Sequence, residues 1–169
     1  MKREILSFSN KISKHLSKPD KKFSADMTYG MLAAGSCLLT DVVEQLHEDT
    51  KKVNSVERLT RHLNNGTSFT ALKSYLTAIR KWAPQEPVIH IDDSDVVKPD
   101  GYKFEALGLV RDGSKSTASK TVYEKGYHVT EACVLTKNNH PVSIFSKIHS
   151  SKEKNFTSNN DVTFSAMER

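Results

Sequence analysis

Cysteine and long apolar runs are scarce in this 169-residue sequence, and each scarcity excludes a class of protein. The two cysteines, Cys37 and Cys133, lie far apart without the spacing of metal ligands, so we expect both to be buried free thiols. No apolar run approaches the roughly 18–20 residues that span a bilayer. The opening residues MKREILSFSNKISKH are basic but contain no apolar stretch long enough for a signal peptide. A cytoplasmic protein that makes no membrane contact is therefore expected.

The sequence also contains no internal repeat and no low-complexity tract. Apolar residues make up 37% and charged residues 27%, which is typical of a globular chain with a modest core. A chain of this length forms one domain or two small ones.

Positive charge is unevenly distributed along the chain. Residues 1–84 contain fourteen Lys and Arg against eight Asp and Glu, whereas residues 85–169 contain eleven against twelve. The excess of positive charge therefore lies entirely in the first half. A polyanion that docks there is the simplest functional interpretation, and an ordinary solvated basic surface fits equally well.

Apolar residues recur at helical spacing through residues 1–84. We expect an amphipathic helix that ends at Pro19, a buried helix from Phe23 to Leu39, and a further helix from Ser68 to Trp82. The segment APQEP, residues 83–87, interrupts this pattern, because two prolines three residues apart cannot lie inside one helix. A domain boundary is therefore expected between residues 84 and 85.

Two short helices are predicted within the intervening segment TDVVEQLHEDTKKVNSVERLTRHLNNG. Thr40 can cap the first, and Asn54 followed by Glu57 resembles a capping box at the start of the second. Asn65-Gly66 would close the second helix. Three apolar residues of that helix are expected to face the core: Val56, Leu59 and Leu63.

The second short helix also has a basic side, because Arg58, Arg61 and His62 are left towards solvent when its apolar residues point inward. Two short helices with a basic second member are what a helix-turn-helix needs to enter the major groove of DNA. A helical bundle with an exposed basic face fits the same residues equally well. If DNA binds here, the candidate contacts are Lys51, Lys52, Arg58 and Arg61, followed by Lys21 and Lys22.

Beyond residue 87 the pattern changes to that of strands. VIHIDDSDVV, residues 88–97, predicts a strand that acquires acidic residues towards its end. Residues 126–136 and 141–149 predict two more strands, joined by a polar turn of hairpin length. Residues 100–120 are expected to form a loop with one short element, and the last nine residues the opening turns of a helix. The expected fold class is α+β, with a helical region followed by a β-region.

The aspartates of the first strand are candidate chemical groups. Asp92 should share one face of the strand with His90 and Ser94, whereas Asp93 points to the other. A carboxylate among apolar neighbours is costly to bury unless it binds a cation, and Mg²⁺ prefers such oxygen ligands. Solvated aspartates at a strand end fit the same pattern. A nuclease site made of Asp92, Asp93 and Asp95 is disfavoured, because successive side chains alternate between faces.

The run IDDSDV, residues 91–96, resembles the first-aspartate strand of DDE transposases from bacterial insertion sequences. In that family an apolar run is followed by Asp, any residue, and Thr or Ser. A basic, glycine-containing stretch at 98–113, the opening Lys125-Gly126-Tyr127 of a later strand, and a hairpin partner at 141–147 agree with the family. The basic helical region ahead of them is similar in character to the part that binds the terminal repeats.

The resemblance implies an RNase-H-like core, of which the β-region would supply the first three strands. In such a core two Asp and one Glu hold two divalent ions, Mg²⁺ or Mn²⁺, for an in-line phosphodiester displacement. The first of these carboxylates has a match here, and the resemblance assigns it, as catalytic residue and metal ligand, to Asp92. Asp93 takes the variable middle position, and Asp95 is a candidate outer-shell group.

The other two carboxylates of the family have no match in these residues. Asp100, Asp112 and Asp161 lie in polar or loop-like surroundings, and Glu168 comes too early to be the catalytic Glu. We therefore expect a DNA-binding region over residues 1–84, followed over residues 85–169 by an incomplete catalytic core. That core is expected to be inactive alone and need not hold a metal ion.

Two functions stay open at this stage. The chain can be the N-terminal fragment of a cut-and-paste transposase that binds the double-stranded terminal inverted repeats of its element in the nucleoid, as a monomer or a homodimer. It can instead be a catalytically inactive DNA-binding module that regulates transposition by occupying those ends.

Overall fold

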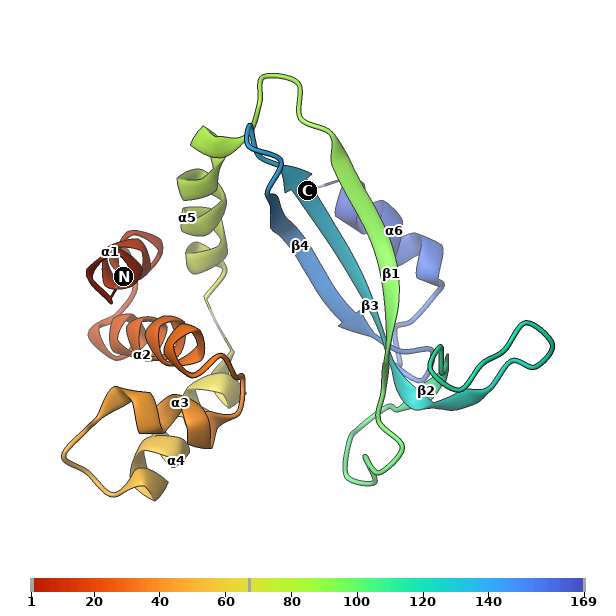
Figure 1. Ribbon diagram of the computed structural model, residues 1–169, viewed down its shortest axis with the longest axis horizontal. Helices are drawn as coiled ribbons and strands as arrows, with labels where there is room; N and C mark the ends of the chain where they lie inside the picture. The colour runs from red at the N-terminus through yellow and green to blue at the C-terminus, as the bar shows by residue number, and fades with distance from the viewer. Residues whose placement is uncertain (1, 67, 169) are drawn as a thin grey trace. The chain divides into compact units, whose positions relative to one another are not determined.

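The computed structural model describes residues 2–66 and 68–168 and divides the chain into two units, Met1–Lys81 and Trp82–Arg169. The first unit is helical and the second is built on an antiparallel sheet (Figure 1). The α+β class expected from the sequence is therefore confirmed. The division falls three residues before the boundary expected between residues 84 and 85.

Five α-helices form the described part of the first unit, and a 3₁₀ turn at Arg80–Trp82 follows them. The helices are α1 (Lys2–Ile12), α2 (Lys18–Ala34), α3 (Leu39–Leu46), α4 (Lys52–Asn65) and α5 (Phe69–Ile79). Val42 and Val43 of α3 and Leu59 of α4 are buried together, and Phe23 and Met27 of α2 pack against them. Helices α2, α3 and α4 therefore share one apolar core, while α1 packs between α2 and α5.

The ends of α2 differ from the sequence expectation because of one proline and one glycine. Pro19 lies in the first turn, where the missing N–H breaks no helical bond, and the hydroxyl of Ser17 caps the helix by accepting from the Asp20 N–H. Gly35 then ends the helix with φ of 61°, a conformation that glycine adopts without strain. The prediction of a helix from Phe23 to Leu39 was therefore wrong at both ends.

Several other local expectations are also wrong. Thr40 and Asn54 lie inside α3 and α4 instead of capping them. Leu63, expected in the core, is 48% exposed, whereas Leu59 is fully buried. Neither cysteine is a buried thiol: one is exposed and the other half-buried.

The second unit contains four described strands with β3 at their centre. The strands are β1 (Ile89–Val97), β2 (Gly108–Arg111), β3 (Tyr123–Leu135) and β4 (Pro141–His149). β1 pairs with one edge of β3, with Asp93 opposite Thr130. On the other edge, β2 pairs with the first residues of β3 and β4 pairs with the rest. The three long strands lie where the sequence predicts strands.

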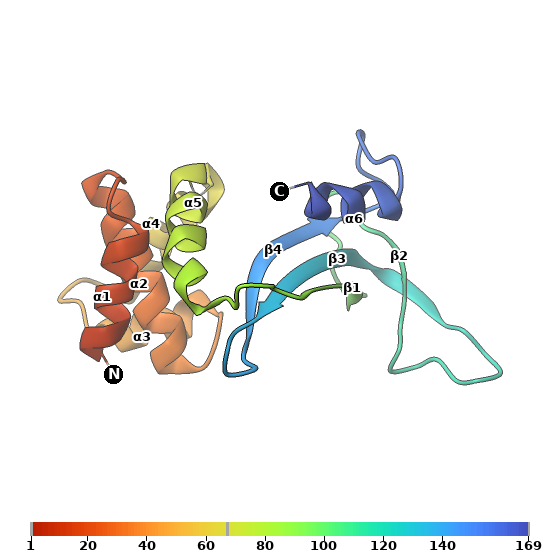
Figure 2. The same cartoon turned by 90° about the horizontal axis from the view of Figure 1, so that it is seen from above.

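Helix α6 (Asn159–Met167) lies across one face of this sheet, and no other described helix of the second unit covers the opposite face, here called the open face (Figure 2). Thr130, Ala132 and Val134 alternate along β3 and are buried, as is Val162 of α6. On the opposite face the β3 residues are only half-buried, and Ile148 of β4 is 64% exposed. The two faces of β1 therefore meet different surroundings.

Candidate functional site

The turn between α3 and α4, residues 47–51, is held in place by Glu48. Its carboxylate accepts hydrogen bonds from Lys22 Nζ at 2.6 Å, from Ser55 Oγ at 2.6 Å and from Arg58 Nη2 at 3.0 Å. These donors, Lys22 first among them, lower the pKa of Glu48 from an ordinary 4.5 to about 2. Helices α3 and α4 are therefore joined by a turn that is tied to α2 and to α4.

Arg58 lies inside this ion-pair network and does not face open solvent. Its side chain is 26% exposed, and its two terminal nitrogens bind Asp26 at 2.8 Å and Glu48 at 3.0 Å. Lys22 binds the same two carboxylates. The expectation that Arg58 points to solvent is therefore wrong, and the positive charges of Arg58 and Lys22 are compensated within the unit.

The other four sequence-predicted DNA contacts are on the surface. Lys52 pairs with Glu44 at 2.6 Å, and both side chains are more than half exposed, so this pair is weak. Lys21 and Lys51 are exposed and form no ion pair within the described residues, while Arg61 is exposed and bonds to the Glu57 carbonyl of its own helix. Three positive charges, those of Lys21, Lys51 and Arg61, are thus left for a partner.

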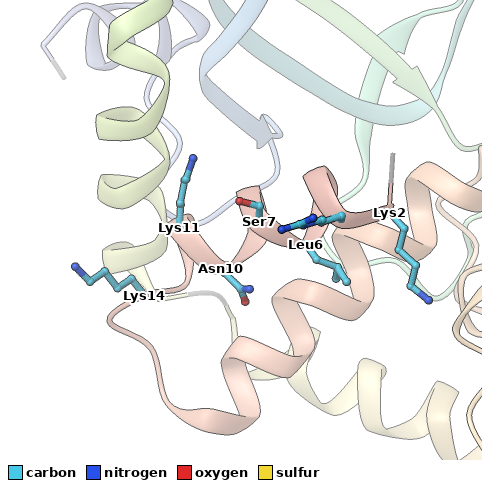
Figure 3. Close-up of a pocket in the computed structure, with 7 residues that line it drawn as sticks. Lys2, Leu6, Ser7, Asn10, Lys11 and Lys14 are labelled. Carbon is cyan, nitrogen blue, oxygen red and sulfur yellow. The ribbon is translucent and has the colours of Figure 1, made fainter.

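A second basic surface, which the sequence interpretation missed, lies on α1 and α5. A hollow of about 670 Å³ between them is lined by lysine, histidine and hydroxyl side chains. Its lining residues are Lys11, Lys14, His15, Thr70, Lys73, Ser74, Thr77 and Ala78, and none of them is acidic. Lys11 and Lys14 also line an adjoining hollow on α1 together with Lys2 and Arg3 (Figure 3). We call Lys2, Arg3, Lys11, Lys14, His15 and Lys73 the α1–α5 basic surface.

The sequence did contain a signal for this surface. No Asp or Glu occurs between Glu4 and Asp20, or from Arg58 to Gln85. The two acid-free stretches supply α1 with the turn after it, and α5. Because helix packing brings α1 against α5, their lysines meet where no carboxylate is near.

Asp92 lies in the middle of β1 on the open face of the sheet, with its side chain exposed. The residue of β3 that pairs with it is Glu131, so two carboxylates lie directly opposite each other on neighbouring strands. Like charges in this arrangement destabilise a strand pair. Among the described residues no donor bonds to Asp92, which leaves its oxygens available to an external group.

The described residues do not complete the metal centre that the family resemblance implies. Within residues 2–66 and 68–168, no group of three or more His, Cys, Asp or Glu could hold a metal ion. Glu131 is the carboxylate opposite Asp92, and Asp112 accepts hydrogen bonds from Ser114 and Lys115 in its own loop. The three carboxylates of a two-metal centre are therefore not assembled, and no catalytic step is assigned to Asp92.

On the other face of β1, a row of polar side chains is partly buried. Asp93 accepts a hydrogen bond from Thr130 Oγ1 at 2.5 Å, and this oxygen lies 2.9 Å from His149 Nε2. Asp95 pairs with His128 Nδ1 at 2.6 Å, and the His128 ring stacks on that of His149. Asp95, expected as an outer-shell group for Asp92, thus lies on the opposite face and is bound to His128.

His149 is buried as a neutral ring. It is 1% exposed, and burial, followed by the charge of His128, lowers its pKa below the ordinary 6.5. Because Thr130 donates its hydroxyl proton to Asp93, the Thr130 oxygen accepts from His149 Nε2–H. The ring's single proton is therefore on Nε2, and Nδ1 is buried without a partner among the described residues.

Comparison of the chain with protein families, with curated proteins and with solved structures finds no match. Among the described helices, none combines the length and apolar character needed to cross a membrane.

Proposed function

We propose that this chain is the DNA-binding part of a cut-and-paste DDE transposase. In this proposal the helical unit binds the double-stranded terminal inverted repeats of the element in the nucleoid, and the sheet unit carries the first aspartate of an RNase-H-like core. The observation that carries the proposal is the position of Asp92. It is an exposed carboxylate in the middle of the first of three long antiparallel strands, on the open face and without a donor among the described residues.

The helical unit supports the DNA-binding half of the proposal. It holds the excess positive charge of the chain, and its α3–α4 pair has the form of a helix-turn-helix. Lys51 precedes α4, and Arg61 lies on the exposed side of the helix that would enter a major groove. Contacts of this kind go mainly to phosphates and position the protein on the duplex.

A second candidate function fits the finding that residues 2–66 and 68–168 assemble no complete carboxylate set. A chain that binds the element's ends but assembles no two-metal centre would occupy those ends without cleaving them. It would then act as a regulator of transposition. The two candidates predict the same DNA binding and differ in what happens after binding.

The test is fluorescence anisotropy of the chain with two labelled duplexes over a salt series. One duplex carries the end sequence that flanks the gene, and the other is a scrambled version of it. We expect a preference for the end sequence that persists as salt rises, since non-specific binding weakens steeply with salt. Asp92→Asn is the matched control, because it removes a charge from the sheet unit and should leave binding unchanged. Equal binding to both duplexes, or no binding, would contradict the proposal.

A further inference from the structure

We propose that the α1–α5 basic surface binds the phosphodiester backbone of duplex DNA as a second contact, separate from the α3–α4 helix-turn-helix. This inference rests on the proposed function. It assigns the sequence-independent part of DNA binding to a surface outside the helix-turn-helix.

The lining of the surface has the chemistry of a phosphate contact. Lys11 and Lys14 meet Lys73 across the hollow, and Thr70 and Ser74 of α5 add hydroxyl groups between the charges. Thr70, Lys73, Ser74 and Thr77 follow one side of α5, because residues three and four apart are neighbours on a helix. Lysine and hydroxyl side chains supply many of the phosphate contacts in protein–DNA complexes.

The charges of this surface are available, unlike those around the helix-turn-helix. Within the described residues no carboxylate pairs with Lys11, Lys14 or Lys73, and all three are exposed. By contrast, Lys22 and Arg58 are bound to Asp26 and Glu48. A phosphate that approaches α1 and α5 therefore meets positive charge without first displacing an internal ion pair.

The length of the surface suits a duplex backbone. Nine residues separate Lys2 from Lys11 on α1, which corresponds to about 14 Å at the helical rise of ~1.5 Å per residue. Each phosphate of a DNA strand advances ~3.4 Å along the duplex axis but lies roughly twice that far from the next one, so this distance spans about two phosphate-to-phosphate intervals. Several consecutive phosphates can therefore lie along α1 while Lys73 reaches the same strand from α5.

The other polyanions that a basic surface can bind fit less well. A membrane-binding helix inserts several large apolar side chains beside its lysines, whereas Ala78 is the one apolar residue that lines the hollow between α1 and α5, and Leu6 the one that lines the adjoining hollow on α1. An acidic protein partner would be expected to bury an aromatic centre, and no Phe, Tyr or Trp lines either hollow. A phosphodiester backbone needs neither feature.

The test compares two triple variants of the full chain that remove three positive charges each. The surface variant is Lys11→Gln with Lys14→Gln and Lys73→Gln. The matched control, on α2 and the α3–α4 helix-turn-helix, is Lys21→Gln with Lys51→Gln and Arg61→Gln. All six residues are exposed, and circular dichroism checks that both variants fold as the wild type does. Binding to the end duplex and to the scrambled duplex is measured by anisotropy over a salt series, with polyglutamate as a competitor.

We expect the surface variant to bind both duplexes at least tenfold more weakly, by the same factor for each. The slope of log affinity against log salt should fall in magnitude by roughly 2.7, at ~0.9 for each lost phosphate contact. The control variant should instead reduce the preference for the end duplex. Because its charges are expected to contact the major-groove site, the two losses are distinguishable.

Each other outcome has a defined meaning. Unchanged affinity and slope in the surface variant, with wild-type binding intact, overturns this inference and leaves the proposed function standing. If the wild type binds both duplexes equally and the surface variant loses this binding, the result supports the inference and contradicts the proposed function. Competition by polyglutamate that exceeds that of the scrambled duplex overturns DNA as the partner. Absence of binding to either duplex overturns both.

Discussion

The two units of this chain satisfy their polar groups in different ways. In the helical unit, Arg58 and Lys22 share the carboxylates of Asp26 and Glu48, so that charge is balanced by charge. In the sheet unit, Thr130 and the neutral ring of His149 form a hydrogen-bonded chain that ends on a single carboxylate. The first arrangement depends on carboxylates that stay ionised, and the second on a histidine that stays neutral. The two units should therefore respond differently to acid and to mutation.

The largest expected effect concerns whether the units unfold independently. Leu59→Ala removes a fully buried side chain from the core of the helical unit and should lower its free energy of unfolding by ~2–5 kcal/mol. Leu63→Ala, on the same helix but 48% exposed, is the matched control and should change it by less than ~0.5 kcal/mol. Urea titrations followed by circular dichroism at 222 nm report mainly the helical unit.

The same titrations followed by tryptophan fluorescence report the sheet unit, because the single tryptophan, Trp82, begins it and accepts a hydrogen bond from the Lys137 N–H. Leu59→Ala should leave the fluorescence transition in place. A parallel shift of both transitions would show that the two units unfold together, which contradicts independent unfolding.

The second prediction is that acid weakens the units in a fixed order. The pKa of Glu48 is lower in the folded state than in the unfolded state, so its contribution is complete above pH ~4.5 and is lost as the pH falls to about 2. The pKa of His149 is also lowered, so the unfolded sheet unit takes up a proton more readily than the folded one. Its stability should therefore fall as the pH drops below 6.5, before the helical unit is affected.

Urea midpoints at pH 7.5, 5.5 and 3.5 check this order with the same two signals. Glu48→Gln should remove about 1–3 kcal/mol at pH 7.5 and flatten the loss of the helical signal below pH 4.5. If the urea midpoint of the helical unit falls first, between pH 7.5 and 5.5, the predicted order is wrong, and acid acts on the helical unit through groups other than Glu48.

The smallest expected change in the free energy of unfolding concerns the two faces of β1. Asp93→Ala leaves the buried hydroxyl of Thr130 without its acceptor and should destabilise the sheet unit by ~1–2 kcal/mol. Asp92→Ala removes one of two opposed carboxylates and should be neutral or stabilising by up to ~1 kcal/mol at low salt. Fluorescence-detected urea unfolding of both variants measures the difference, and equal destabilisation would show that Asp92 is not on an open face.

Residue patterns predicted the elements of this fold better than their ends. Short runs rich in apolar and β-branched residues, two of them joined by a polar turn of hairpin length, placed the three long strands. The ends of α2 were missed because Pro19 was taken as the end of the preceding helix and Gly35 as the interior of a continuous one. Their effect depends on whether they fall in the first turn or just past the last one.

In the candidate sites, too, the sequence predicted the position of a residue along its element but not the residues that contact it. The strand position of Asp92 followed from the sequence, but its partner Glu131 depends on strand register, which no local pattern shows. Arg58 was expected on the surface because the apolar residues of its helix were assigned to the core, whereas Asp26 and Glu48 approach it from α2 and the turn. The polar row of Asp93, Thr130 and His149 joins three strands and has no signature along any one of them.

The acidic strand β1 has a consequence for how the chain behaves at high concentration. Among the described strands, β1 pairs with β3 on one side only, so its other edge presents free backbone groups. Such an edge can template pairing with a second chain and start a growing aggregate. Asp92, Asp93 and Asp95 place three negative charges along that edge, where a second copy of β1 would bring three more against them. Whatever part Asp92 takes in chemistry, the charges of β1 should therefore disfavour the pairing of one sheet with the next.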